Sequence, residues 1–229
     1  MKKLAIPNNL TTMAYNSIKE YIVNGRLDDN SRLTEEFLST QLGISKSPIR
    51  EALNRLEAEG LIRIEPRKGA YLRRLTPSEV SDLFDLREAL EVHVMRTAKM
   101  TPALLAELRQ SLKRQRAFLK ANDKTHYIEE DVHFHAELAK ATGNARLCSV
   151  LENMQNQVWL MRRKSYDLSS STAPGHHDAV VKALEDKDRA KAEAAMRTHI
   201  RSVGERLLEF LETQQPETED TGTDSRLAS

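Results

Sequence analysis

The side chains best suited to chemistry are one carboxylate and three imidazoles in the second half of the chain. Asp131 and His135 are four residues apart, so they share one face of a predicted helix. His177 lies near the start of another predicted helix, and His199 lies in a third. Such donors from three packed helices can converge on Zn²⁺, Ni²⁺, Mn²⁺ or Fe²⁺. From the spacing alone, however, a single histidine on a helix is more often an ordinary core or surface residue.

A second group of residues has the composition of a nucleic-acid contact. Four of these residues lie at the start of a predicted helix: Ser45, Lys46, Ser47 and Arg50. The other three lie in a later predicted turn: Arg67, Lys68 and Gly69. In a helix-turn-helix, the first residues of the second helix enter the major groove, where an arginine can read guanine. Hydroxyls and free N–H groups at a helix start suit phosphates, and a glycine permits a tight wing turn. The alternative is an ordinary solvated face.

The charge is unevenly distributed along the chain. The total is 35 Lys and Arg against 34 Asp and Glu, a net charge of +1 that by itself argues against a basic nucleic-acid footprint. Residues 1–75, however, hold 13 Lys and Arg against 9 Asp and Glu, or +4, which leaves 22 against 25, or −3, for residues 76–229. The polar, acidic composition of 214–229 predicts a disordered tail.

The elements that must position these residues are mostly helical. Only 8 Gly and 7 Pro occur in 229 residues, and aromatic residues make up 5%, which disfavours folds with many strands and turns. Apolar spacing predicts three helices and a β-hairpin within 8–75, the pattern of a winged helix-turn-helix. From Thr76 onward the spacing predicts an all-α bundle over 76–213, with helices starting near residues 76, 101, 125, 144, 174 and 188. The expected fold class is therefore mainly α, in two domains.

An ordered motif runs through the first domain. It reads Leu42-Gly43-Ile44-Ser45-Lys46-Ser47-Pro48-Ile49-Arg50-Glu51-Ala52-Leu53, and Glu59-Gly60-Leu61-Ile62 follows. Within residues 15–71 this pattern resembles the DNA-binding domain of GntR-family bacterial regulators. Lys46 stands where the family usually has Arg, and Glu36 stands where some members have Arg. Since lysine offers a point charge rather than a planar fork, a different operator is expected.

The second domain carries a further set of motifs. They are Asp131-Val-His-Phe134-His135, Ala141-Thr-Gly143-Asn144, His177 and Ala195-Met196-Arg-Thr-His199-Ile200. These motifs resemble the effector domain of the FadR-type branch of the same family, called FCD. Many members of that branch hold a divalent metal with an Asp and three His and bind a small organic acid there. The resemblance implies Asp131, His135, His177 and His199 as metal ligands.

Other residues of the second domain receive their roles from the same resemblance or from spacing. Arg87, four residues before Glu91, is expected to meet the carboxylate of the acid, with a buried ion pair to Glu91 as the alternative. His133 and His176 are expected outside the ligand set. Asn144 is expected to cap a helix. Arg162 is expected to lie at the surface, with the lining of the ligand cavity as the alternative.

The expected function is a ligand-responsive transcription regulator, a repressor that binds near-palindromic double-stranded operator DNA as a homodimer. The single Cys148 and the absence of a long apolar run fit a cytoplasmic protein without a membrane partner. A catalytic role is disfavoured, because the sequence has no His-Glu-x-x-His and only one Glu-x-x-His, where a di-iron bundle needs two. A metal-sensing regulator and a helical metalloenzyme remain the alternatives.

Overall fold

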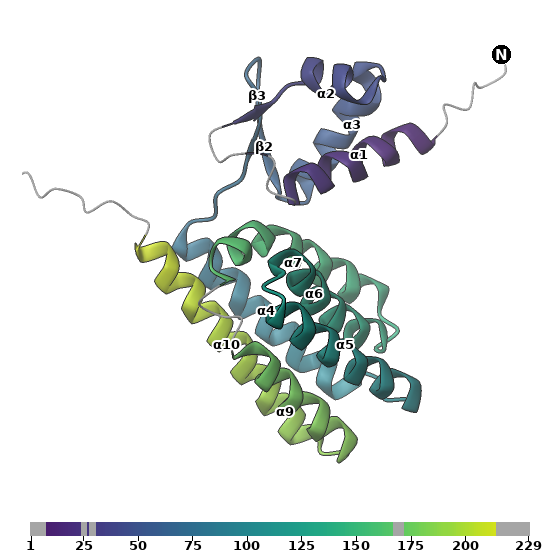
Figure 1. The fold of residues 1–229 in the computed structure, drawn as a ribbon, viewed down its shortest axis with the longest axis vertical. Helices are drawn as coiled ribbons and strands as arrows, with labels where there is room; N and C mark the ends of the chain where they lie inside the picture. Colours follow the sequence, from purple (N-terminus) through teal and green to yellow (C-terminus); the bar gives the residue numbers. More distant parts are fainter. Residues whose placement is uncertain (1–7, 24–26, 28–30, 167–171, 214–229) are drawn as a thin grey trace, which may run out of the picture.

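The computed structural model describes residues 8–23, 27, 31–166 and 172–213, which form two parts joined near residue 75 (Figure 1). The smaller part, called the head below, contains α1 (Asn8–Val23), β1 (Arg32–Leu33), α2 (Glu35–Leu42), α3 (Lys46–Ala58), β2 (Ile62–Glu65) and β3 (Gly69–Leu72). The larger part contains α4 (Pro77–Thr97), α5 (Pro102–Lys120), α6 (Lys124–Lys140), α7 (Ala145–Lys164), α9 (Ala173–Glu185) and α10 (Arg189–Thr213). The predicted fold class, a winged helix-turn-helix followed by a helical bundle, is confirmed. The expected acidic tail at 214–229 lies outside the described residues.

Helices α2 and α3 form the helix-turn-helix of the head, and the ends of α2 lie at residues that favour helix capping. The Thr34 side chain accepts a hydrogen bond from the Phe37 amide at 3.1 Å and so caps α2. Gly43 ends α2 in the left-handed conformation, with φ of 65°. Ile49 and Leu56 on the inner face of α3 are buried in the same apolar core as α1. The outer face of α3 is therefore left to solvent.

The sheet has three strands, whereas the sequence predicts only the two of a hairpin. Strand order is β1-β3-β2, and Leu33 of β1 lies opposite Ala70 of β3 in antiparallel register. With two residues, β1 is too short to show an alternation of apolar and polar side chains in the sequence. Strand β1 therefore pairs the wing, which is the hairpin of β2 and β3, with the segment that leads into α2.

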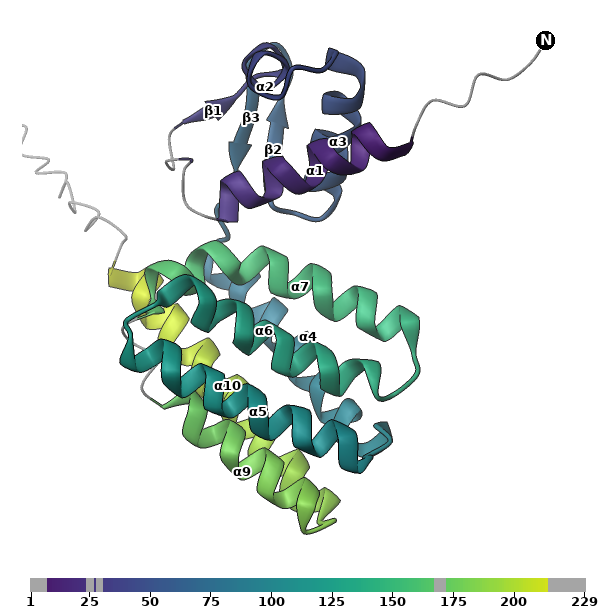
Figure 2. The same ribbon diagram turned by 45° about the vertical axis from the view of Figure 1, so that its right-hand side comes forward.

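The bundle surrounds an apolar core with a polar centre. Helix α4 packs along α10, α9 along α10, and α5 and α7 lie on either side of α6 (Figure 2). A capping box opens α4: Thr76 Oγ1 accepts from the Glu79 amide, and the Glu79 carboxylate accepts from the Thr76 amide. Met95, Met196 and Ile200 are fully buried in the core. Among the described helices, none combines the length and apolar character needed to cross a membrane.

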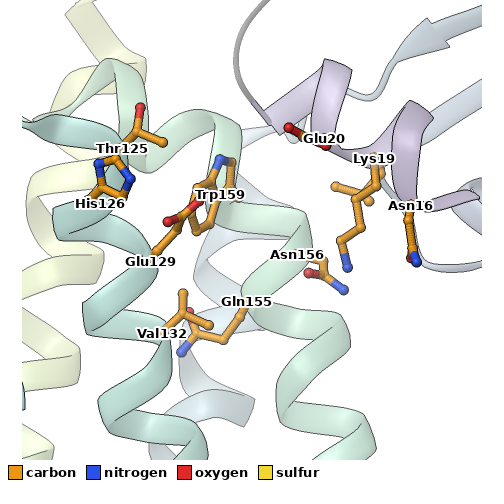
Figure 3. Close-up of a pocket in the computed structure, with 11 residues that line it drawn as sticks. Asn16, Lys19, Glu20, Thr125, His126, Glu129, Val132, Gln155, Asn156 and Trp159 are labelled. Carbon is orange, nitrogen blue, oxygen red and sulfur yellow. The ribbon is translucent and has the colours of Figure 1, made fainter.

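The head lies over α7 of the bundle (Figure 2). Leu72 belongs to the core of the head, and Leu75 already belongs to the core of the bundle. Gly60 of the head packs so closely on α7 that a Cβ there would lie 3.0 Å from the Gln157 side chain. A cleft of about 630 Å³ separates α1 from α6 and α7 (Figure 3).

Candidate functional site

The residues predicted to contact DNA lie at two neighbouring places on the head. These are the N-terminal end of α3 with Ser45, Lys46, Ser47 and Arg50, and the β2–β3 turn with Arg67, Lys68 and Gly69. The side chains of Lys46 and Arg50 are 54% and 63% exposed. A groove of about 440 Å³ is lined by residues of both places. The second helix of the motif and the wing therefore present their cations to one shared space.

Two carboxylates of α2 accompany the cations of α3. Arg50 donates two hydrogen bonds to Glu35, from Nε to Oε1 and from Nη2 to Oε2, both at 2.7 Å. The hydrogen bond from Arg50 lowers the pKa of Glu35. Lys46 Nζ lies 3.9 Å from a carboxylate oxygen of Glu36. Exposed ion pairs contribute only about 0–1 kcal/mol, so replacing Glu35 by a guanine edge as the partner of Arg50 costs little.

Gly69 has a structural task within the wing itself. Its φ is +118°, and a Cβ there would lie 2.8 Å from the Leu33 carbonyl oxygen. The pairing of β1 with β3 therefore requires glycine at this position, apart from any contact with DNA. Arg67, at the turn, also has a positive φ, of 65°. This tight turn holds Arg67 and Lys68 at the tip of the wing.

The four predicted metal ligands converge inside the bundle. Asp131 and His135 come from α6, His177 from α9 and His199 from α10, and one donor atom of each lies within 4.8 Å of the others. All four side chains are buried. His177 Nε2 lies 3.2 Å from His199 Nε2 and 3.7 Å from Asp131 Oδ1. Donors of a tetrahedral zinc site lie roughly 3.4 Å apart for metal–ligand distances of about 2.1 Å. We call these four residues the cluster.

Two of the imidazoles are oriented by partners behind them. His135 Nδ1 is hydrogen-bonded to the Glu91 carboxylate, which can only accept, so Nδ1 carries the proton and Nε2 presents a lone pair. His177 Nδ1 lies 2.9 Å from Gln115 Oε1 and donates to it in the same way. Outer partners of this kind fix the tautomer and ring orientation of metal-binding histidines. Both Nε2 lone pairs are therefore directed into the cluster.

The protonation states of the cluster are those that a metal needs. Burial lowers the pKa of His177 to about 3 and the pKa of His199 well below the ordinary value, so both are neutral. Burial raises the pKa of Asp131, but electrostatic interactions, above all with the Arg162 guanidinium, outweigh it and hold the pKa below its usual range. The pKa of Glu91 is likewise raised by burial but lowered overall, to about 2, by His135 and Arg87. Neither carboxylate needs to lose a proton at neutral pH.

The donor set fits a divalent cation. Within the described part of the chain, Asp131 Oδ1 and His135 Nε2 are buried without a hydrogen-bond partner. A buried acceptor left without a partner costs about 1–3 kcal/mol, and a cation between these atoms would remove that cost. Three imidazole nitrogens and one carboxylate suit Zn²⁺, Ni²⁺, Mn²⁺ or Fe²⁺.

Arg87 is buried beside Glu91 and keeps spare donors. Its Nε donates to Glu91 Oε1 at 2.7 Å, and the side chain is 1% exposed. Among the described residues, Nη1 and Nη2 of Arg87 have no hydrogen-bond partner. The buried ion pair thus uses one nitrogen and leaves two for an anionic ligand.

The expectation that Arg162 lies at the surface is wrong. Arg162 is buried, and its Nη2 donates to Asp131 Oδ2. Its Nη1 donates to Gln155 Oε1 at 3.3 Å. Arg162 follows the buried Val158 by four residues, which places it on the inward stripe of α7. That spacing was the available signal, whereas nothing in the sequence singles out Gln115 or Gln155.

The remaining expectations for this domain concern single residues. His133 is 38% exposed and bonds to Glu107 at 3.0 Å, away from the cluster. The His176 ring lies 5.9 Å from the His199 ring without joining the cluster. Asn144 caps α7, since its Oδ1 accepts from the amides of residues 146 and 147.

A pocket of about 260 Å³ lies between α6 and α7 next to the cluster. Its lining includes Val132, His135, Cys148, Glu152 and Gln155. One residue of the cluster therefore borders a space of the size that a small ligand needs.

Comparison with known proteins places both parts of the chain. The profile of the "Bacterial regulatory proteins, gntR family" matches residues 10–72, and the FCD domain profile matches residues 82–202. The HTH-type transcriptional repressor RspR of Escherichia coli K12 is 27% identical over 195 residues, which are 83% of this chain and 86% of that protein. The gluconate operon transcriptional repressor of Bacillus subtilis is 28% identical over 178 residues, 74% of this chain and 73% of that protein. A solved structure from Rhodococcus sp. RHA1, described as a GntR transcriptional regulator, has the same fold, with a TM-score of 0.78 and 20% identity over 88% of this chain and 99% of that one.

Proposed function

This chain belongs to the GntR family of bacterial regulatory proteins and carries an FCD domain, and we propose that it is a transcriptional repressor controlled by a small organic acid. Two of these relatives are named as transcriptional repressors, and one of the two is the repressor of the gluconate operon. The buried cluster carries the proposal, because it supplies an input site inside the second domain, apart from the exposed cations of the head. The relatives are regulators and not enzymes, which agrees with the absence of catalytic motifs from the sequence.

The head binds double-stranded operator DNA. The start of α3 enters the major groove, where Arg50 exchanges Glu35 for a guanine edge and Ser45, Lys46 and Ser47 meet phosphates or bases. The wing residues Arg67, Lys68 and Gly69 approach the DNA backbone. The exposure of Lys46 and Arg50 and the groove shared with the wing support this arrangement.

The second domain binds the acid. One divalent cation is held by Asp131, His135, His177 and His199 and, when bound, supplies positive charge and a coordination position for a carboxylate. Arg87 offers Nη1 and Nη2 to the same ligand. The charges cancel within each of two ion pairs, Arg162 with Asp131 and Arg87 with Glu91, and the lowered pKa values of His177 and His199 keep these two imidazoles neutral. A divalent cation held by the cluster would therefore make this buried site net positive, which favours an anionic ligand.

The two sites communicate through the arrangement of two heads. A homodimer places two copies of α3 in successive major grooves of a near-palindromic operator. An acid that binds one arrangement of the heads better than another shifts the population and so changes the affinity for DNA.

Metal content and ligand screening test this function. Elemental analysis of protein purified without chelator should find one divalent metal per chain, and His135→Ala with His199→Ala should remove it. Small carboxylic acids should raise the melting temperature of metal-loaded protein and leave metal-stripped protein unchanged. Acids that stabilise both forms equally would contradict the proposed ligand site. If metal alone changes operator affinity and no acid does, the protein is instead a metal-sensing regulator.

A further inference from the structure

Two cavities meet at the same pair of side chains between α6 and α7. Val132 of α6 and Gln155 of α7 line both the pocket beside His135 and the cleft beneath the head. Figure 3 shows these two side chains next to each other, with Trp159 further along α7 and residues of α1 across the cleft. The space next to the cluster and the space under the head are therefore divided by a wall that includes both side chains.

Gln155 is buried with half of its amide unused. Its residue is 5% exposed, and Oε1 accepts from Arg162 Nη1 at 3.3 Å. Its Nε2 carries two donor hydrogens and has no hydrogen-bond partner among the described residues. Burying an amide donor without an acceptor is unfavourable, so the position suits a ligand that brings an oxygen.

The pocket also borders the cluster, where a bound cation would attract an anionic ligand. His135 Nε2 is buried without a partner in the described chain, and His135 lines the same pocket as Gln155. A carboxylate has two oxygens, so one can lie on the side of the cluster while the other accepts from an amide N–H. With a cation on His135 Nε2, an organic acid would meet the cation with one oxygen and the Gln155 Nε2 donor with the other.

Resting on the function proposed above, we infer that Gln155 donates a hydrogen bond from Nε2 to the carboxylate of the acid. We infer further that the change in Gln155 on ligand binding is transmitted to the head. Gln155 forms part of the cleft wall, and Gln157, two residues later, packs against Gly60 of the head. Both residues lie within one turn of α7. A displacement of Gln155 by the ligand therefore acts on the surface that supports the head.

The single cysteine of the chain allows a test with acids of known structure. Cys148 lines the pocket and precedes Gln155 by seven residues, or about 10 Å along the helix axis. 6-Maleimidohexanoic acid carries a carboxylate on a flexible chain of similar reach, and N-ethylmaleimide carries none. With both reagents the thiolate adds to the maleimide double bond, a carbon–sulfur bond forms, the neighbouring carbon gains a proton, and nothing leaves.

The reaction rates report whether the pocket holds the carboxylate. The measured quantity is the rate of labelling by 6-maleimidohexanoic acid divided by the rate of labelling by N-ethylmaleimide. For metal-loaded protein this ratio should exceed the ratio for free glutathione by roughly 10-fold or more, because a hydrogen bond to a charged group contributes at least that factor. A ratio equal to that of glutathione would overturn the assignment.

Two matched variants separate Gln155 from its neighbours. Gln155→Glu keeps an acceptor for Arg162 but loses the NH₂ donor, so the ratio should fall to the glutathione value. Asn156→Asp makes the same chemical change at a residue that lines the cleft and is absent from the pocket lining, and it should leave the ratio unchanged. An unchanged ratio in Gln155→Glu protein would show that Gln155 does not hold the acid.

The one tryptophan of the chain reports transmission to the cleft. Trp159 lines the cleft, so protein labelled with the acid should differ in emission wavelength from protein labelled with N-ethylmaleimide. Identical emission would reject transmission through this wall. Metal content and DNA binding, measured before labelling, report on the proposed function separately. A metal-loaded, DNA-binding protein without the rate preference would reject the role of Gln155 alone.

Discussion

Acidification should destabilise the helical domain of the metal-free protein well before its carboxylates are protonated. His177 and His199 are fully buried and neutral, and the pKa of His177 is about 3, whereas an imidazole in the unfolded chain has a pKa of about 6.5. Below pH 6.5 the unfolded chain therefore binds protons that the folded chain does not bind. The free energy of unfolding must fall as the pH decreases from 6.5 toward 3.

The size of the effect follows from the pKa difference. Each pH unit in this window costs about 1.4 kcal/mol per histidine, so His177 alone costs about 2 kcal/mol between pH 7 and 5. His199 acts in the same direction. Glu91 and Asp131 have lowered pKa values, so their contribution is present above their unfolded pKa values near 4 and is lost only below them. The raised pKa of the exposed His126 acts in the opposite direction.

Urea unfolding of EDTA-treated protein at pH 8, 7, 6 and 5, followed by Trp159 emission, measures this dependence. The matched variant is His177→Gln, which removes one titrating group. Its free energy of unfolding should decrease by about 2 kcal/mol less than that of the wild type between pH 7 and 5. Equal stability at pH 7 and 5, or the same pH dependence in both proteins, would refute the assignment of a neutral buried His177.

Three further predictions concern single residues. Arg50→Ala should weaken specific operator binding by about 1–3 kcal/mol in a mobility-shift titration, and unchanged affinity would exclude base reading by Arg50. Glu91→Gln should lower metal affinity about 10- to 100-fold in a chelator competition, because the partner that orients His135 is weakened; affinity equal to the wild type would contradict that role. Gly69→Ala should destabilise the wing by about 1–3 kcal/mol, since the new Cβ meets the Leu33 carbonyl at a positive φ, and an unchanged melting temperature would count against this strain.

Local signals in the sequence predict much of the fold. The cap at Thr34, the glycine after α2 and the capping box at Thr76 and Glu79 act within a few residues, so the sequence places these helix ends. The match to the FCD motifs predicts the four cluster residues as one site, whereas their spacing alone leaves ordinary core or surface roles open. Their convergence within 4.8 Å depends on the packing of α6, α9 and α10.

The features that the sequence does not predict depend on contacts between distant segments. Strand β1 exists through its pairing with β3, and two residues carry no periodicity of their own. A single arginine is most often solvated, which favours the surface for Arg162, but Asp131, 31 residues earlier, provides a buried partner. The two hydrogen bonds from Arg50 to Glu35 likewise require that α2 and α3 pack at a particular angle.

The affinity for operator DNA, measured with and without the acid in metal-loaded and metal-stripped protein, tests the central claim most directly. The operator would be recovered from genomic fragments by selection with the protein, and the acid would be the one that raises the melting temperature most. The acid should lower the affinity of metal-loaded wild-type protein and have no effect on stripped protein or on the His135→Ala, His199→Ala variant. An equal effect of the acid in all three would contradict control through the cluster.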